Sequence, residues 1–270
     1  MYNVEILKQG GIDVTKGLEL LGDMEMYNSV LKEFLEEYYE RIKKIQGLKE
    51  SSDMENYAIE VHSLKSDSKY IGATKLAELA YNHEMASKAG DITSVNTHYN
   101  ELIIEANRVI TIVMDYFKSS AEPSTIVESP AAEEVTVISS DELNKVTQTI
   151  LVADDSSIIR DFVKEIFNGK YDVLMASDGK EVINIINSNN NIAAVLLDLN
   201  MPNVNGFEVL DYFKEKNLFR KIPVSIISGS NDKESIDRAF SYDIVDMLNK
   251  PFNINNVKMV VEKTVSRKEG

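Results

Sequence analysis

The chain has 270 residues, no cysteine and a net charge of −15, from 44 acidic and 29 basic side chains. Its length favours two domains of ordinary size over one. The lack of cysteine excludes disulfide and thiol chemistry, and the lack of any basic segment disfavours binding to nucleic acid.

The apolar runs of the chain are short. One of the longest, AAVLL at 193–197, is far below the roughly 20 residues that a membrane-spanning helix needs. The first residues are polar and of mixed charge, so we expect no secretory signal. A cysteine-free chain also suits a reducing compartment. These features predict a cytoplasmic protein without membrane contact.

Residues 1–118 contain no proline and have the periodicity of amphipathic helices. Apolar residues recur at steps of four along 23–45, and further helices are expected at 53–71, 74–89 and 92–117. Short connections between long helices predict an all-α antiparallel bundle.

A second pattern begins after a segment of different composition. Residues 119–148 are rich in Ser, Pro, Ala and Glu, which is typical of an extended linker. From 149 to 270, five short apolar strands alternate with five helices, which predicts an α/β domain with a flavodoxin-like, doubly wound, five-stranded parallel sheet. In such sheets the ligand-binding and catalytic residues usually lie at the carboxyl ends of the strands.

Charged residues stand at three of these strand ends. Asp154 and Asp155 follow the first strand, Asp198 ends the third, and Lys250 follows the fifth. Three converging carboxylates repel one another unless a cation offsets their charge. Oxygen ligands in a partly open shell favour Mg²⁺.

Four motifs in this half, VADD, LLDLNMPNVNG, SIISGS and NKPF, resemble the receiver domain of bacterial response regulators. The resemblance implies that Asp198 is the phosphoacceptor, a carboxylate nucleophile that forms an aspartyl-phosphate. It also implies that Ser228 bonds a phosphoryl oxygen, that Lys250 balances its charge, and that the Lys250–Pro251 bond is cis. The implied Mg²⁺ ligands are Asp154, Asp155, Asp198 and the backbone of Asn200.

This domain has two alternative interpretations. A receiver-like scaffold that has lost phosphorylation is disfavoured, because every residue type of the acceptor site is present. A phosphatase of the haloacid dehalogenase type needs a second aspartate two positions after the nucleophile, where this chain has Asn200. One departure from the receiver pattern is Met247, at a position that is usually aromatic.

In the helical half, the segment VHSLKSDSKYIG at 61–72 places a histidine beside lysines. On a helical wheel His62 shares a flank with Lys65, Ser66 and Lys69, away from the apolar stripe. We therefore expect His62 at the surface, where ammonium groups would stabilise a phosphoryl group on its ring. On the same side, Tyr70 is expected to point outward and offer an apolar docking surface. His83 and His98 are expected to be ordinary surface or packing residues.

The order of these segments resembles a histidine phosphotransfer (HPt) domain across 1–118. The resemblance implies that His62 is phosphorylated and that Lys65 is its electrostatic aid; Ser66 stands where the family motif has glycine. A histidine kinase dimerisation domain is disfavoured, because no ATP-binding segment follows it.

Together, the resemblances imply a two-component phosphorelay protein that passes phosphoryl groups between His62 and receiver aspartates, including its own Asp198, in Mg²⁺-dependent transfer. The expected partners are a sensor histidine kinase and other receiver or HPt proteins, and the protein is expected to be a phosphotransfer intermediate, without ATP-using kinase activity. The alternative is a phosphorylation-switched binding module whose bundle is only an interaction surface. The sequence leaves the oligomeric state open.

Overall fold

The computed structural model describes residues 2–119, 148–189, 191–229 and 233–268. The expected linker at 119–148 therefore lies almost wholly outside the described residues. In the first part, the helices are α1 (Val4–Gln9), α2 (Val14–Leu21), α3 (Met24–Glu50), α4 (Met54–Tyr70), α5 (Thr74–Lys88) and α6 (Ile92–Lys118). No described helix combines the length and the apolar character needed to span a bilayer.

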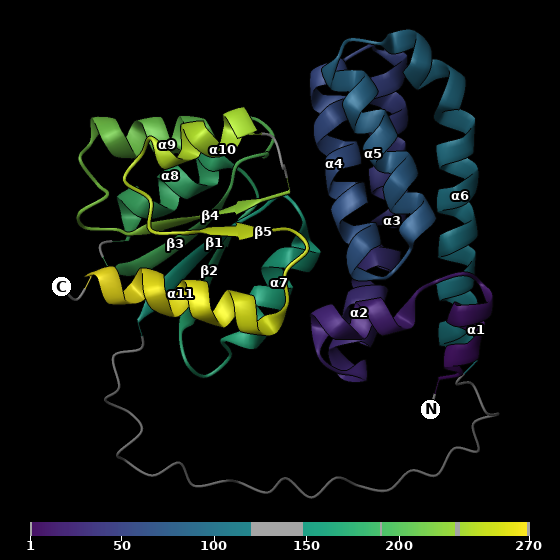
Figure 1. Cartoon of the computed structure of the whole chain (residues 1–270), viewed down its shortest axis with the longest axis horizontal. Helices are drawn as coiled ribbons and strands as arrows, with labels where there is room; N and C mark the ends of the chain where they lie inside the picture. The colour runs from purple at the N-terminus through teal and green to yellow at the C-terminus, as the bar shows by residue number, and fades with distance from the viewer. Residues whose placement is uncertain (1, 120–147, 190, 230–232, 269–270) are drawn as a thin grey trace, which may run out of the picture.

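The four long helices, α3 to α6, form the expected bundle, and α1 and α2 lie across one of its ends (Figure 1). Three of these helices begin with an aspartate whose side chain accepts a hydrogen bond from a backbone N–H of the first turn, at Asp23, Asp53 and Asp91. Between α4 and α5 the chain turns at Gly72, where φ is +77° and a Cβ would lie 2.2 Å from the Asp13 carbonyl oxygen. Only glycine fits this turn, and it sets α4 against α5.

The second part alternates strands and helices as expected. Its elements are β1 (Thr149–Ala153), α7 (Ser157–Ile166), β2 (Asp172–Ala176), α8 (Gly179–Ser188), β3 (Ile192–Asp198), α9 (Gly206–Glu215), β4 (Val224–Ser228), α10 (Lys233–Phe240), β5 (Met247–Asn249) and α11 (Ile254–Lys268). The strands are parallel and run in the order β2-β1-β3-β4-β5. Helices α7 and α11 cover one face of the sheet, and α8, α9 and α10 cover the other (Figure 1). The predicted fold class is confirmed in both parts.

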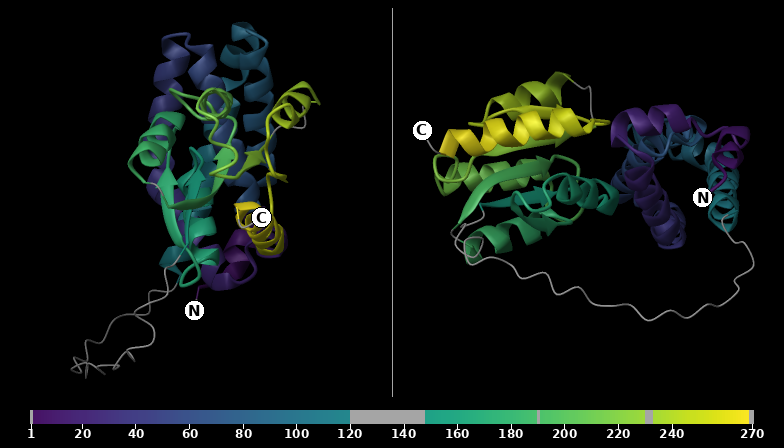
Figure 2. Two further views of the ribbon diagram at one scale, coloured as in Figure 1. Left: turned by 90° about the vertical axis from the view of Figure 1, so that its left-hand side faces the viewer. Right: turned by 90° about the horizontal axis from the view of Figure 1, so that it is seen from below.

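The two parts pack against each other. The carboxyl ends of the strands point toward α4, while α7 and the start of α11 lie beside α2 and α3 (Figures 1 and 2). One continuous apolar core runs from the bundle into the α7/α11 side of the sheet. The packing therefore brings the helix that carries His62 to the edge of the sheet where the acidic residues lie.

Candidate functional site

The three aspartates expected to converge do so. Asp154 and Asp155 follow β1, Asp198 ends β3, and one carboxylate oxygen from each lies within 4.8 Å of the others. Lys250 reaches them from the end of β5, with its Nζ 2.8 Å from Asp154 Oδ2 and 2.5 Å from Asp198 Oδ2. The Lys250–Pro251 peptide bond is cis, as the receiver resemblance implied.

The three converging carboxylates need compensating positive charge nearby. Burial raises the pKa of Asp154 well above its ordinary value, and the neighbouring Asp198 and Asp155 add to the rise, while Lys250 opposes it. Burial alone would lower the pKa of Lys250, but Asp154 and Asp198 outweigh it and raise that pKa. In addition, Asp155 Oδ1 is buried without a hydrogen-bond partner among the described residues. Converging carboxylate oxygens with a spare acceptor are a donor set that fits a hard divalent cation.

His62 is not at the surface, so the expectation of an exposed ring was wrong. Its relative exposure is 1 %, because the receiver half covers the flank of α4 that a helical wheel places away from the bundle core. A Cβ built on Gly229 would lie 2.9 Å from both Nε2 and Cε1 of His62. Nε2 itself has no hydrogen-bond partner among the described residues. The ring is thus buried between the two domains, with its free nitrogen toward the end of β4.

Two side chains fix the opposite edge of the ring. His62 Nδ1 lies 2.7 Å from Glu84 Oε1, and Lys65 Nζ lies 2.6 Å from Glu84 Oε2 and 3.2 Å from Nδ1. Burial would raise the pKa of Glu84, but its hydrogen bond and charge interactions with His62 and Lys65 outweigh burial and hold it well below the ordinary value. An ionised Glu84 accepts a hydrogen bond from Nδ1–H, and this tautomer leaves the lone pair on Nε2. Lys65, expected on an exposed flank, is itself buried.

Polar contacts join α4 to the loop after β1, and the sequence reasoning missed them. Ser63 donates a hydrogen bond to Asp155 Oδ2, so the bundle touches an expected metal ligand directly. One helical turn further on, Asp67 accepts from Ser156 Oγ at 2.6 Å and pairs with Arg41 Nη2 at 3.2 Å. Each of these side chains looks like an ordinary solvated helix residue in the sequence, and only the docked arrangement reveals its partner.

An aromatic cluster closes the interface. Tyr70 is fully buried, with its ring centroid 5.9 Å from that of Phe162 and 5.8 Å from that of Phe252. Its hydroxyl accepts a hydrogen bond of 3.2 Å from the Phe252 backbone N–H. The residue expected to offer an apolar docking surface therefore packs against the receiver half of the same chain.

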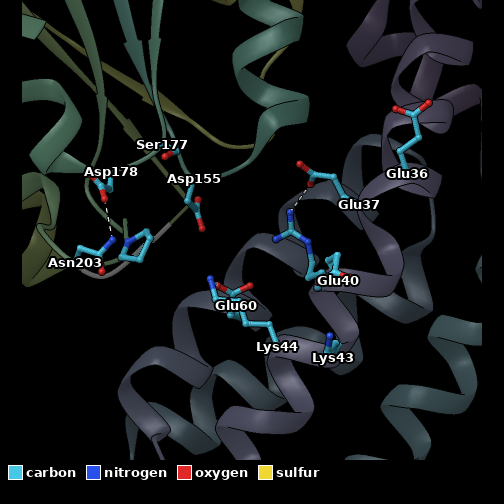
Figure 3. A pocket seen from close by; sticks show the side chains of 12 residues that line it. Glu36, Glu37, Glu40, Lys43, Lys44, Glu60, Asp155, Ser177, Asp178 and Asn203 are labelled. Carbon is cyan, nitrogen blue, oxygen red and sulfur yellow. Dashed lines mark hydrogen bonds and ion pairs between the residues drawn. The ribbon is translucent and has the colours of Figure 1, made fainter.

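Two clefts of opposite charge flank the buried site. The acidic cleft, of about 850 Å³, lies between α3/α4 and the loops that carry Asp155 and Asp178. Figure 3 shows Asp155 facing Glu37 and Glu60 across it. The basic cleft, of about 720 Å³, lies on the other side, between α4/α5 and the ends of β3 and β4. It is lined by Lys65, Lys69, Tyr81, Glu84, Met85, Lys88, Leu199, Asn200, Phe207, Ser228, Gly229 and Ser235.

Comparisons with known families match both halves. The response regulator receiver domain model matches residues 150–262, and the Hpt domain model matches residues 29–110. The two-component response regulator ORR11 of Oryza sativa is 29 % identical over 117 residues, which are 43 % of this chain and 80 % of that protein. Response regulator RR06 of Streptococcus pneumoniae is 38 % identical over 106 residues, or 39 % of this chain and 47 % of that protein.

Solved receiver structures are similar to the second half. The chemotaxis response regulator CheY4 of Vibrio cholerae aligns with a TM-score of 0.41 at 22 % identity, over 44 % of this chain and 99 % of that one. The receiver domain of the Francisella response regulator 1452 aligns with a TM-score of 0.39 at 30 % identity, over 46 % of this chain and 98 % of that one. On the strength of the two family matches, the chain carries an Hpt domain followed by a response regulator receiver domain, and it is a two-component phosphorelay protein.

Proposed function

We propose that the chain exchanges a phosphoryl group between His62 and its own Asp198 while the two domains are docked. The observation that carries this proposal is the buried, unpartnered Nε2 of His62 beside Gly229. Lys250 lies between Gly229 and the acceptor. Its Cδ is 3.8 Å from the built Gly229 Cβ, and its Nζ contacts Asp198. A phosphoryl donor and its acceptor held together in this way need no diffusional encounter.

The transfer is a displacement at phosphorus. The bond from His62 Nε2 to phosphorus breaks, and the electron pair returns to the ring nitrogen, while an Asp198 oxygen forms the new bond. Glu84 keeps the proton on Nδ1 during this step, so that Nε2 can leave and be regenerated as a neutral imidazole nitrogen. Ser228 and Lys250 are placed to contact the transferred oxygens. The reverse reaction uses the same contacts.

Asp154, Asp155, Asp198 and the backbone carbonyl of Asn200 would hold Mg²⁺. The bound ion supplies charge neutralisation for the carboxylates and for the phosphoryl oxygens. Among the described side chains, Ser63 is the bundle residue that donates to one of these carboxylates, at Asp155. Docking of the bundle and loading of the cation are therefore expected to influence each other.

The two domain types imply contacts with histidine kinases and with other phosphorelay proteins. The rival hypothesis, in which the bundle is only a binding surface, does not account for an unpartnered imidazole nitrogen directed at the receiver. It predicts that phosphate reaches Asp198 but never His62.

The test is to charge the full chain with a small phosphodonor and Mg²⁺ and to follow the base-stable label of phosphohistidine and the acid-stable label of aspartyl-phosphate. We expect wild type to acquire both labels. The rate constant for exchange between His62 and Asp198 should be independent of protein concentration. Asp198→Asn should acquire neither, and His62→Gln should keep only the acid-stable label. Asp211→Asn and His98→Gln, at exposed positions outside the site, are the matched controls. Identical labelling of Asp198→Asn and wild type would contradict the acceptor assignment, and a rate proportional to concentration would contradict exchange within one molecule.

A further inference from the structure

Ser66 lies on α4, one helical turn after His62, at the position where the HPt motif has glycine. Its side chain is 2 % exposed, and its hydroxyl has no hydrogen-bond partner among the described residues. The other two serines of α4, Ser63 and Ser68, are also buried, but each donates to the backbone carbonyl four residues earlier, at 3.1 Å and 2.6 Å. A buried hydroxyl without a partner costs free energy, so the packing of the helix alone does not explain Ser66.

The flank of α4 that carries Ser66 faces the receiver half. Successive residues of a helix are about 100° apart, which places Ser66 between His62 and Tyr70 around the axis, about 40° from each. A Cβ built on Gly229 would lie 2.9 Å from the His62 ring, and the Tyr70 hydroxyl accepts a hydrogen bond from the Phe252 N–H at 3.2 Å. Ser66 therefore lies between two contacts with the receiver half, beside the carboxyl ends of β4 and β5 (Figure 1).

The His62 ring directs its unpartnered nitrogen toward the same side. Its Nδ1 lies 2.7 Å from Glu84 Oε1 and 3.2 Å from Lys65 Nζ. Around the helix axis, Lys65 is about 60° to one side of His62 and Ser66 is about 40° to the other. Because Nδ1 is directed toward the Lys65 side, Nε2 is directed away from it, toward the Ser66 side. Helical side chains lean toward the N-terminus, and Cβ atoms four residues apart are about 5–6 Å from each other, so the Ser66 hydroxyl is within reach of a phosphoryl group on Nε2.

Such a phosphoryl group presents oxygens to both domains. On the receiver side, the proposed contacts come from Ser228 and Lys250. On the bundle side, Lys65 is held by a carboxylate at the Nδ1 edge, and the Ser63 hydroxyl donates to a receiver aspartate. Within the part of α4 that faces the receiver, Ser66 is the buried hydroxyl that the structure leaves free for a phosphoryl oxygen, as far as the described residues extend.

We propose that the Ser66 hydroxyl donates a hydrogen bond to a phosphoryl oxygen while the group passes between His62 and Asp198. The inference rests on the proposed function and adds a catalytic residue to it. The bond between His62 Nε2 and phosphorus breaks and the bond to an Asp198 oxygen forms, while the hydroxyl keeps its proton and stabilises negative charge on the transferred oxygens. The unpartnered hydroxyl of the resting chain is thus a donor already in place for the phosphoryl group.

The experiment compares exchange rates in the full chain charged with a small phosphodonor and Mg²⁺. We expect Ser66→Ala to slow exchange between His62 and Asp198 by about 10- to 100-fold in both directions, as for the loss of a hydrogen bond to a charged group. The resting variant should dock at least as tightly as wild type, because a methyl group replaces a buried hydroxyl without a partner. Its radius of gyration and the ¹⁵N shifts of the His62 imidazole should therefore not change. Ser68→Ala removes a buried hydroxyl that donates to a backbone carbonyl, and as the matched control it should exchange at the wild-type rate.

A second variant, Ser66→Gly, separates the hydroxyl from the space that it occupies. Glycine also lacks the donor but leaves more room at the interface, and we expect it to slow exchange as Ser66→Ala does. A wild-type rate in either variant would overturn the proposal. Slower exchange together with a larger radius or shifted His62 signals would overturn it too, because Ser66 would then act through docking. Absence of exchange in wild type would overturn the proposed function as well, whereas equal rates in wild type and Ser66→Ala would remove only the role of Ser66.

Discussion

At the scale of single residues, Gly229 sets how closely the two domains can approach. The built Cβ would lie 2.9 Å from two atoms of the His62 ring, a distance that real Cβ atoms essentially never show. The ring cannot retreat freely, since its other edge is hydrogen-bonded to Glu84 at 2.7 Å. A single methyl group at this position is therefore expected to change the distance between the imidazole and the acceptor.

We predict that Gly229→Ala slows exchange between His62 and Asp198 by about 10- to 100-fold, from an overpacking cost of ~1–3 kcal/mol. Charging of Asp198 by a small phosphodonor should persist, because the acceptor carboxylate itself is unchanged. The measurement is the rate at which base-stable label appears after acid-stable label. Gly47→Ala, where a Cβ would have nothing within 4 Å, is the matched control. Equal exchange rates in Gly229→Ala and wild type would show that the domains exchange phosphate in another arrangement.

Glu84 is a positioning residue for His62. We predict that Glu84→Gln slows exchange by about 10- to 100-fold, since a hydrogen bond to a charged group contributes ~1.5–3 kcal/mol. The variant should also shift the tautomer population of His62, which imidazole ¹⁵N chemical shifts report directly. A merely structural role would slow exchange without changing the tautomer. Glu78→Gln, an exposed glutamate on the same helix, is the control.

The sequence identified the acceptor residues better than the partners of His62. Asp154, Asp155, Asp198 and Lys250 follow apolar strands, and parallel topology brings strand ends together, so their meeting could be predicted. Glu84 stands on a different helix, and nothing in its local pattern separates it from solvated glutamates. Its role depends on the register between α4 and α5, which the apolar periodicity alone does not define.

At the scale of elements, α4 is buried on two sides. One side packs into the bundle through residues such as Tyr57, Val61 and Leu64. The other carries His62, Ser63, Asp67 and Tyr70 against the receiver half. A helical wheel finds only the first side, because a surface that docks through polar partners has the composition of a solvated one. This is why the sequence placed His62 in solvent while it identified the helix correctly.

We predict that Tyr70→Ala separates the two domains, because truncation of a buried aromatic side chain costs about 3–5 kcal/mol. The interface loses its contacts with Phe162 and Phe252 together. Small-angle scattering should show a larger radius of gyration, and far-UV circular dichroism should show unchanged helix content. Tyr70→Phe removes only the acceptor of the Phe252 N–H, worth about 1 kcal/mol, and should stay docked. An unchanged radius in Tyr70→Ala would mean that the polar contacts alone hold the domains.

At the scale of the whole molecule, the docked domains bury both chemical groups of the relay. His62 and Asp198 are each 1 % exposed or less, so a separate kinase or receiver cannot contact either one until the domains part. The equilibrium between docked and parted states is thus expected to control exchange with partner proteins. Any group that titrates at the interface biases this equilibrium with pH.

Glu33 on α3 is such a group. Its side chain lies close to Ser157 and Asp161 of α7 and lines a separate cleft between α3 and α7, together with Glu36, Lys164 and other charged residues. Burial raises its pKa from 4.5 to about 7, and the nearby Asp161 and Glu37 add to the rise, while Ser157 opposes it. The docked state therefore binds more protons than the parted state between about pH 4.5 and pH 7. Asp67, which burial raises to a pKa of about 6, acts in the same direction.

We predict that docking is tightest at or below about pH 4.5 and weakens as the pH rises to 7, because the raised carboxyl pKa contributes stability only while the proton is bound. Since the native chain has no cysteine, dyes can be placed at Tyr39→Cys on α3 and Phe240→Cys on α10, and energy transfer between them should fall as the pH rises from about 4.5 to about 7. In the same dye-carrying chain, Glu33→Gln should flatten this slope, because a neutral amide replaces the protonated carboxyl without a proton to lose. Glu36→Gln, whose carboxylate is 66 % exposed, should keep it. Energy transfer that rises with pH, or an equal slope in Glu33→Gln, would show that Glu33 does not control the interface.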